Sequence, residues 1–398
     1  MSLPRVDASR SNGQSSPSTI LHAACGSTDT AEIVGAFEDA FGECALAFIV
    51  IFASARCDKP ALAKALTAAF GDTPIIGCTT AGEIDGMGYK EGSVVGIGFP
   101  ASHFAIRTHL LEKLSTFSIA DGAQLASTLL TPDGFGETAL WPNSFVLLLV
   151  DGCSRQEDAL VSSVAPSLGA TPLVGGSAGD GLDFQKTFIL EGGRFHEDAA
   201  VLSLIRTRCD VDVVRFDHFS PTTRKMIVTS ADPEKRIVHE INAEPAAREY
   251  ARMVGKDPGQ LSPFIFAENP VVVRVGGEHH VRAIQKVEDN GDLRFYCAID
   301  EGLVLTVAEA GNIVENIDAA LGTLNATRTP DMILGFDCVL RRLEVEQKQQ
   351  TKMMSDVLRA HRVFGFNTYG EQFGNKHVNQ TFTGICFYPP AADGTSAE

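Results

Sequence analysis

The sequence predicts an α/β protein in which one strand-helix-strand unit is used three times. The stretch Thr73-Pro-Ile-Ile-Gly-Cys-Thr-Thr-Ala-Gly-Glu-Ile84 returns as Thr171-Pro-Leu-Val-Gly-Gly-Ser-Ala-Gly-Asp180 and, more diverged, as Val363-Phe-Gly-Phe-Asn-Thr-Tyr-Gly-Glu371. Each copy is typical of a buried strand that runs into a glycine-hinged loop, because few other residues tolerate positive φ or close backbone approach.

The surroundings of the first two copies repeat at the same spacing. The apolar run Phe48 to Phe52 precedes copy one as Phe145 to Val150 precedes copy two, and the two phenylalanines that open these runs are 97 residues apart. A repeat of this length indicates a duplicated half-domain rather than a solenoid. We therefore expect residues 44–99 and 141–205 to share one strand order, and residues 332–387 to repeat it more weakly.

The N-terminal elements follow the alternation of strand and helix. Ser27 or Thr28 is expected to cap a first helix, which Gly42 ends. The run 48–52 is apolar on both faces, so it predicts a strand in a sheet that is covered on both sides. Pro60 opens a helix that reaches Phe70. Strand, helix and strand in this order predict a βαβ unit, and a further helix is expected over residues 119–130.

The chain divides into two predicted domains and two tails. Residues 1–19 are rich in Ser, Asn, Gln and Pro and are expected to form a disordered tail. The duplicated unit fills an N-terminal domain, residues 20–210, because the apolar pattern changes to short alternating runs after Asp210. An α+β C-terminal domain, residues 211–388, uses the same unit again, and residues 389–398 form a second tail.

Within the C-terminal domain we expect strands first and the repeated unit last. Strands are predicted at 225–228 and 236–241, followed by a helix over 245–253. The dipeptide Asn290-Gly291 predicts a hairpin turn. Residues 340–361 are expected to form a polar helix with a thin apolar stripe, in the place where the first two copies have theirs.

Composition excludes several function classes. The 398 residues carry a formal net charge of −17, which disfavours binding to nucleic acid or to an anionic membrane surface. Nine dispersed cysteines without zinc-ligand spacing are typical of reduced thiols. The longest apolar run, residues 44–55, is shorter than the roughly 20 residues that cross a bilayer. We therefore expect a soluble, cytoplasmic protein.

Three segments carry a resemblance to a known family. They are the glycine-acid loop, His239-Glu-Ile-Asn-Ala-Glu-Pro-Ala-Ala-Arg-Glu-Tyr250, and Phe364-Gly-Phe-Asn-Thr-Tyr-Gly-Glu371 followed by His377-Val-Asn-Gln-Thr381. Together they resemble FIST sensory domains, with N- and C-terminal parts in tandem over residues 20–388. The closing phrase is similar to that of the nitric-oxide-sensing haemoprotein branch, whose members bind haem b and regulate histidine kinases or cyclic-di-GMP signalling proteins.

A haem sensor needs an axial ligand, most often a neutral histidine. His377 is the first candidate for the haem iron because it follows the third glycine loop among aromatic residues, and His239 is the second. Tyr369 and Asn367, held in a loop with Gly370, are the candidates for polar groups that meet a ligand. Each also has a structural reading, in which Asn367 caps a turn and the Tyr369 hydroxyl bonds to backbone.

Catalysis is not expected from this sequence. Glu83, Asp180 and Glu371 recur at matching places, which a shared structural bond to loop amides explains better than acid-base chemistry does. Cys78 has no counterpart in the other copies, and Gly175-Gly-Ser-Ala-Gly179 lacks the spacing and lysine of a phosphate-binding loop.

The expected function is therefore sensory ligand binding without turnover. The preferred ligand is haem b, with nitric oxide as the signal and a histidine kinase or other two-component or cyclic-di-GMP protein as partner. The alternative is a small metabolite such as an amino acid, bound without haem. A homo-oligomer is left open.

Overall fold

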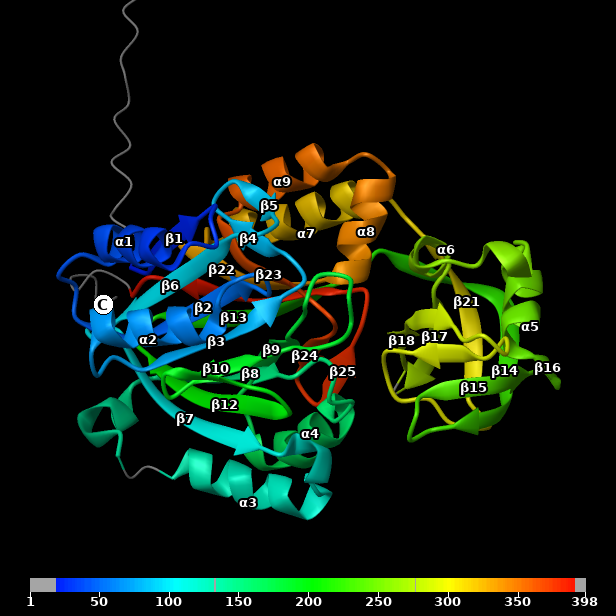
Figure 1. Cartoon of the computed structure of the whole chain (residues 1–398), viewed down its shortest axis with the longest axis horizontal. Coiled ribbons are helices and arrows are strands. Elements are labelled where there is room, and N and C mark those ends of the chain that lie inside the picture. The colour runs from blue at the N-terminus through cyan, green and yellow to red at the C-terminus, as the bar shows by residue number, and fades with distance from the viewer. Residues whose placement is uncertain (1–18, 132–133, 276, 391–398) are drawn as a thin grey trace, which may run out of the picture.

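The computed structural model describes residues 19–131, 134–275 and 277–390, so residues 1–18 and 391–398, with most of both predicted tails, lie outside it. The strand-helix-strand unit occurs three times in these residues, as predicted (Figure 1). The first unit consists of β1 (Leu21–Cys25), α1 (Thr30–Phe41), β2 (Leu46–Ser54), α2 (Lys59–Phe70), β3 (Ile75–Thr80), β4 (Glu83–Asp85), β5 (Gly88–Lys90) and β6 (Val94–Pro100).

The second unit repeats this order with additional short 3-10 turns. It consists of β7 (Phe104–Glu112), η1 (Leu114–Thr116), α3 (Ile119–Leu130), η2 (Gly136–Leu140), β8 (Asn143–Val150), α4 (Glu157–Val164), η3 (Ala165–Leu168), β9 (Leu173–Ser177), β10 (Ile189–Glu191), β11 (Arg194–His196) and β12 (Ala199–Thr207).

The third unit is split in the sequence by a long insertion. It consists of β13 (Asp210–Phe216), α7 (Ile313–Thr327), β22 (Met332–Cys338), α8 (Val339–Gln347), α9 (Thr351–Ala360), β23 (Val363–Thr368), β24 (Glu371–Phe373), β25 (Lys376–Val378) and β26 (Phe382–Tyr388).

The insertion forms a lobe of its own, to the right in Figure 1. This inserted lobe consists of β14 (Phe219–Asp232), β15 (Ile237–Ile241), β16 (Glu244–Pro245), α5 (Ala246–Val254), η4 (Pro258–Gln260), α6 (Pro263–Glu268), β17 (Val271–Val275), β18 (Glu278–Arg282), β19 (Ile284–Val287), β20 (Leu293–Phe295) and β21 (Val304–Ala310). Its strands make one antiparallel sheet, in the order β18-β17-β21-β14-β15-β20-β19, with β16 paired to β15 off this path.

Each unit supplies four strands, in the same order, to one six-stranded sheet. The orders are β1-β6-β2-β3, β7-β12-β8-β9 and β13-β26-β22-β23. This confirms the predicted duplication of residues 44–99 and 141–205 and the weaker third copy. In each sheet the two central βαβ strands are parallel and the last strand returns antiparallel between them and the first.

The units exchange their hairpins, which the sequence did not predict. Hairpin β4–β5 of the first unit extends the sheet of the third, and hairpin β24–β25 of the third extends the sheet of the second. Hairpin β10–β11 of the second unit closes the circle by pairing with β3 of the first. The three units therefore form one interlocked body rather than three independent domains.

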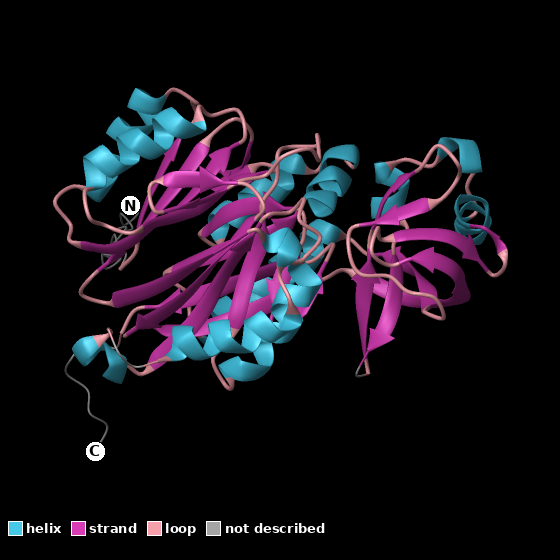
Figure 2. Ribbon diagram, turned by 60° about the horizontal axis from the view of Figure 1, so that its bottom comes forward, coloured by secondary structure: helices cyan, strands magenta, loops and turns pink. Residues whose placement is uncertain are grey.

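The apolar strands bury both of their faces, as the run 48–52 predicted. Phe48, Val50 and Phe52 point into a core that the three sheets share, whereas Ile49 and Ile51 pack under the helices of the first unit. Figure 2 shows the same layering, with strands inside and helices around them. The alternation follows from the period of two in a strand.

Two predicted helix details need correction. Asp29, not Ser27 or Thr28, caps α1, because its carboxylate accepts the Ala31 and Glu32 amides. Residues 340–361 form two helices, α8 and α9, with Gln349 in the left-handed region between them. Because of this turn, α8 packs against residues of the inserted lobe while α9 packs on the sheet of the third unit. One straight helix could not make both contacts.

Candidate functional site

The three glycine loops meet at one end of the three-sheet body. Ala81 N–H donates to the Asn367 carbonyl over 3.0 Å, Gly179 N–H to Thr79 over 2.9 Å, and Tyr369 N–H to Ser177 over 3.2 Å. Each loop is thus tied to the next by backbone hydrogen bonds. The junction joins all three units and fixes the carboxyl ends of their central strands, where α/β sheets commonly bind ligands.

The acids that close the first and third loops have matching bonds. Glu83 accepts the Thr80 hydroxyl at 2.5 Å and the Ser93 amide at 3.1 Å. Glu371 accepts the Thr368 hydroxyl and the Thr381 amide in the same way. These bonds agree with the predicted structural role.

Asp180 departs from this pattern. Its carboxylate accepts three amides of its own loop, those of Phe184, Gln185 and Lys186, and the hydroxyl of Tyr369. The reason is loop length: 12 positions separate the end of β9 from the start of β10 (177 to 189), against 3 in the first unit (80 to 83) and 3 in the third (368 to 371). Asp180 follows the end of β9 at the same interval as the other two acids, and the extra residues, 181–188, come after it, so Asp180 opens a loop where Glu83 and Glu371 open a strand.

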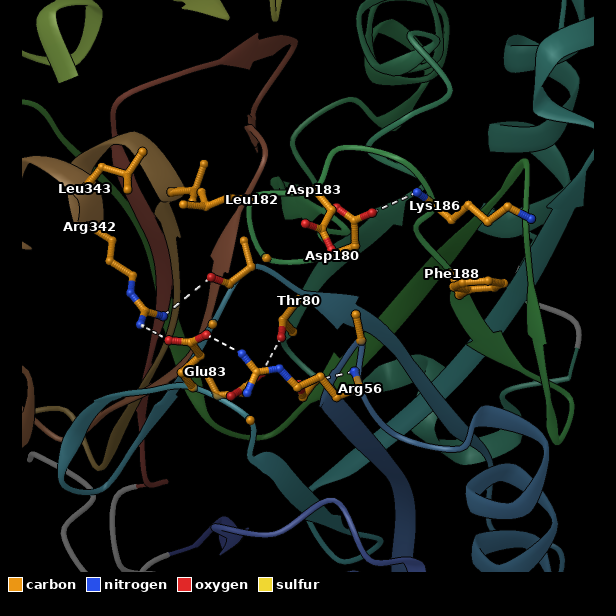
Figure 3. A pocket seen from close by; sticks show the side chains of 18 of the residues that line it. Arg56, Thr80, Glu83, Asp180, Leu182, Asp183, Lys186, Phe188, Arg342 and Leu343 are labelled. Carbon is orange, nitrogen blue, oxygen red and sulfur yellow. Dashed lines mark hydrogen bonds and ion pairs between the residues drawn. The ribbon is translucent and has the colours of Figure 1, made fainter. Parts of the chain in front are cut away.

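This longer segment, which we call the 178–188 loop, forms one wall of a cavity of about 580 Å³. The cavity lies between the loop, the ends of β2 and β3, and the first turns of α8 (Figure 3). The cavity is therefore built from all three units, at the place where the second unit differs from the other two by its longer loop.

Charges of both signs line the cavity. Its residues are Ser54, Ala55, Arg56, Lys59, Thr80, Ala81, Gly82, Glu83, Glu91, Gly92, Asp180, Gly181, Leu182, Asp183, Lys186, Phe188, Val339, Arg342, Leu343 and Glu346. Arg342 is held in place, because its Nη1 donates to the Lys90 carbonyl over 3.0 Å and its Nε to Glu346 over 2.7 Å. Arg56 pairs with Glu91 at 2.7 Å, and Asp183 is exposed on the opposite side. Such a cavity suits a small ligand that carries both charges.

Comparison with known proteins assigns the family. Residues 47–244 match the FIST N domain, and residues 246–374 match the FIST C domain. The chain belongs to the FIST family. FIST domains are sensory ligand-binding domains of signalling proteins. The boundary between the two matches falls inside the inserted lobe, at β16, whereas the predicted limits 20–210 and 211–388 stay predictions.

A similar protein occurs in Methanocaldococcus jannaschii. It is 23% identical over 353 residues, which cover 79% of this chain and 67% of the relative, and its name describes it only as uncharacterized. Within the described part of this FIST chain, no helix combines the length and the apolar character that crossing a bilayer requires.

The predicted loop residues lie behind the cavity of the FIST protein rather than in its lining. Asn367 is buried, and its backbone N–H donates to the Gly82 carbonyl over 2.7 Å. The Tyr369 hydroxyl bonds to Asp180, and its ring packs on Phe184 with 4.5 Å between centroids. Both residues hold the loop junction together, so they support the cavity without touching its interior.

The two predicted histidines lie apart. His377 is on β25 in the sheet of the second unit, whereas His239 is on β15 of the inserted lobe, where it is half-exposed and pairs with Asp292 at 2.7 Å. Burial lowers the pKa of His377, which keeps its imidazole neutral at physiological pH. The structure therefore does not bring the two residues into one site.

The surroundings of His377 do not fit a porphyrin. Its Nε2 is buried and lacks a hydrogen-bond partner among the described residues, as an axial ligand would before binding iron. Yet the ring is packed so closely on Gly370 that a Cβ there would lie 2.2 Å from His377 Cε1. The cavity beside His377 measures about 300 Å³ and is lined by Asp158, Arg282 and Lys376, not by an apolar slot.

Sequence reasoning missed the residues that line the cavity of the FIST protein. Arg56, Asp183 and Arg342 are far apart in the chain and belong to no common motif. One signal was available: the second copy has the longest stretch between its glycine loop and the next apolar run. A length difference within a repeat marks the place where a loop takes on its own role.

A pH-dependent stability is expected from Glu371. Burial raises its pKa to about 8, although the Thr368 and Thr381 hydroxyls oppose the shift. The folded protein therefore keeps a proton that the unfolded chain releases above the ordinary pKa of 4.5. Stability should fall as pH rises between these two values, by at most about 1.4 kcal/mol per pH unit.

Urea unfolding at several pH values checks this expectation. Glu371→Gln should flatten the decline, since glutamine cannot ionise and keeps the same shape. Glu234→Gln, an exposed glutamate in the inserted lobe, is the control and should leave the profile unchanged. Identical profiles for Glu371→Gln and the unaltered protein would show that Glu371 titrates normally.

Proposed function

We propose that this protein senses a small zwitterionic metabolite, such as an amino acid, bound in the cavity beneath the 178–188 loop. The observation that carries the proposal is the lining itself, in which Arg342, held by its hydrogen bonds, faces the same space as the exposed side chains of Arg56 and Asp183. Family membership supports sensory ligand binding in general, and the cavity supports this class of ligand.

The cavity offers a pair of arginines, which share Glu91 as an ion-pair partner, and a pair of aspartates. Arg56 and Arg342 stand on one side in Figure 3, with Asp180 and Asp183 across the cavity. A guanidinium binds a carboxylate through paired, charge-assisted hydrogen bonds, and a carboxylate binds an ammonium group. We therefore place the ligand carboxylate toward Arg56 and Arg342, and its ammonium group toward Asp183.

The 178–188 loop also connects the cavity to the inserted lobe, so it can transmit ligand binding to the lobe. Phe184 has a positive φ of 53°, and its ring packs between Tyr369 of the junction and Tyr296 of the inserted lobe, with 5.7 Å between the Phe184 and Tyr296 centroids. A ligand that orders the loop would change how the lobe packs. In this proposal the lobe then presents the signal to a histidine kinase or another two-component or cyclic-di-GMP protein.

A calorimetric screen of the twenty L-amino acids tests the proposal. At least one should bind, and Asp183→Lys should weaken that binding by roughly 10- to 100-fold, since a hydrogen bond to a charged group contributes about 1.5–3 kcal/mol. Asp39→Lys on α1 makes the same exposed charge change away from the cavity and should leave affinity unaltered. A protein that binds none of the twenty would refute the proposal.

Haem sensing is the second candidate, and the unpaired buried Nε2 of His377 favours it. An absorption spectrum after reconstitution with haem b distinguishes the two. A Soret band that His377→Ala removes, with nitric oxide uptake by the ferrous form, would establish this candidate. A colourless protein that binds an amino acid would exclude it, in agreement with the close packing of Gly370 on the ring.

A further inference from the structure

A second cavity adjoins the polar one. It measures about 650 Å³ and lies between the start of α2 and the exchanged hairpin β10–β11, where Pro60, Ala63, Phe188 and Phe195 give it an apolar wall. We call it the hairpin groove. The groove exists only because the hairpin of the second unit pairs with the sheet of the first and comes to rest beside α2.

The polar cavity and the hairpin groove share two lining residues, Lys59 and Phe188. The Lys59 ammonium lies 4.9 Å from the centroid of the Phe188 ring and donates to the Ala55 carbonyl over 2.8 Å. The Phe188 backbone is fixed on β3, because its N–H donates to the Thr79 hydroxyl over 3.0 Å and its carbonyl accepts the Thr79 N–H. These two side chains therefore form part of the wall between the two spaces.

The groove has the chemistry of a side-chain pocket. Aromatic and aliphatic surface of Pro60, Phe188 and Phe195 is only partly covered by the protein itself. Ligand sites combine such apolar walls with a few polar groups that fix orientation. Here the polar groups lie in the adjoining polar cavity, which holds the charged end of the ligand under the proposed function.

We propose that the ligand is amphiphilic: an amino acid whose large apolar, preferably aromatic, side chain enters the hairpin groove while its zwitterionic end occupies the polar cavity. The inference rests on the proposed function and names the ligand class for the same site. The aromatic ring packs against Phe188 and Phe195, and the aliphatic stem of Lys59 covers the passage between the two spaces. Glycine and alanine fill only the polar cavity.

Calorimetric titration with glycine, L-alanine, L-leucine and L-phenylalanine tests the inference. Affinity should rise along this series, and L-phenylalanine should bind at least about tenfold more tightly than L-alanine, because apolar surface leaves water. The heat capacity change should become more negative in the same order. Equal affinities for the four amino acids would overturn the inference and leave the proposed function standing. If none of the four bound, the inference would also be overturned, and the screen of all twenty amino acids would then decide the proposed function.

A pair of variants locates the apolar part of the site. Phe195→Ala should reduce the preference for L-phenylalanine over L-alanine by several-fold and leave L-alanine binding unaltered. Phe70→Ala removes another half-buried phenylalanine from the same helix-covered cluster, outside the groove, and should keep the preference intact. Sedimentation tests whether a second copy of the chain, rather than a ligand, occupies the groove. This would follow if the unaltered protein were a dimer, if Phe195→Ala dissociated that dimer, and if the protein showed no preference among the four amino acids.

Discussion

Gly175→Ala is expected to destabilise the protein by about 3 kcal/mol, at the upper end for added volume in a packed core. A Cβ at position 175 would lie 1.8 Å from the carbonyl oxygen of Leu148 on the neighbouring parallel strand. That oxygen is backbone and cannot rotate away, so two central strands would have to separate. The shift in the urea midpoint, at constant slope, measures the cost.

The repeat makes this expectation testable three times. Gly77 and Gly365 occupy the matching positions, with Cβ atoms that would lie 2.1 Å from the Ile51 oxygen and 1.8 Å from the Gly335 oxygen. Their alanine variants should lose comparable stability. Gly322 on α7 has open space around it, so Gly322→Ala should stabilise the protein by about 0.5–1 kcal/mol. Equal stability of Gly175→Ala and Gly322→Ala would contradict the strand pairing.

Arg341→Ala is expected to cost about 3–5 kcal/mol, since it leaves buried acceptors without their partner. The guanidinium is fully buried; its Nε donates to Asp337 over 2.6 Å, and its Nη1 lies 3.1 Å from His218 Nδ1. Tyr89 donates its hydroxyl to the other oxygen of Asp337, and Glu344 lies 2.9 Å from the far side of His218. One arginine thus links the first unit, the third unit and the start of the inserted lobe.

Thermal or urea unfolding measures the loss, and two further variants interpret it. Arg359→Ala on α9 breaks an exposed pair with Asp356 and should cost less than about 1 kcal/mol. Adding Asp337→Asn to Arg341→Ala should recover part of the stability, because a neutral amide is easier to bury unpaired than a carboxylate. If Arg341→Ala were as stable as Arg359→Ala, the hydrogen-bond network around Arg341 would not be buried in solution.

The repeated unit could be predicted from sequence because its signals are local. The apolar runs at 48–52 and 145–150 bury both faces, and the loops after β3, β9 and β23 end in polar groups bonded to one another. The hairpin exchange could not be predicted, since β4–β5 has the same local pattern whichever sheet it joins. The split of the third unit was hidden for a similar reason, because β13 is one strand separated from its unit by the whole lobe.

The residues of the candidate site could not be predicted from the sequence for a different reason. Motif-based reasoning favoured residues inside the glycine loops, and Asn367 and Tyr369 indeed occupy the junction, but as its structural bonds. The lining residues Arg56, Asp183 and Arg342 come from three units and meet only after the sheets have assembled. Whether His377 and His239 bind any group stays a prediction.

A crystal structure of the protein grown with the tightest-binding amino acid tests the central claim most directly. We expect ligand density beneath the 178–188 loop, with the ligand carboxylate against Arg56 and Arg342 and its ammonium group toward Asp183. Density at any other place, or an unaltered cavity in crystals of a protein that binds the amino acid in solution, would contradict the claim that this cavity is the sensory site.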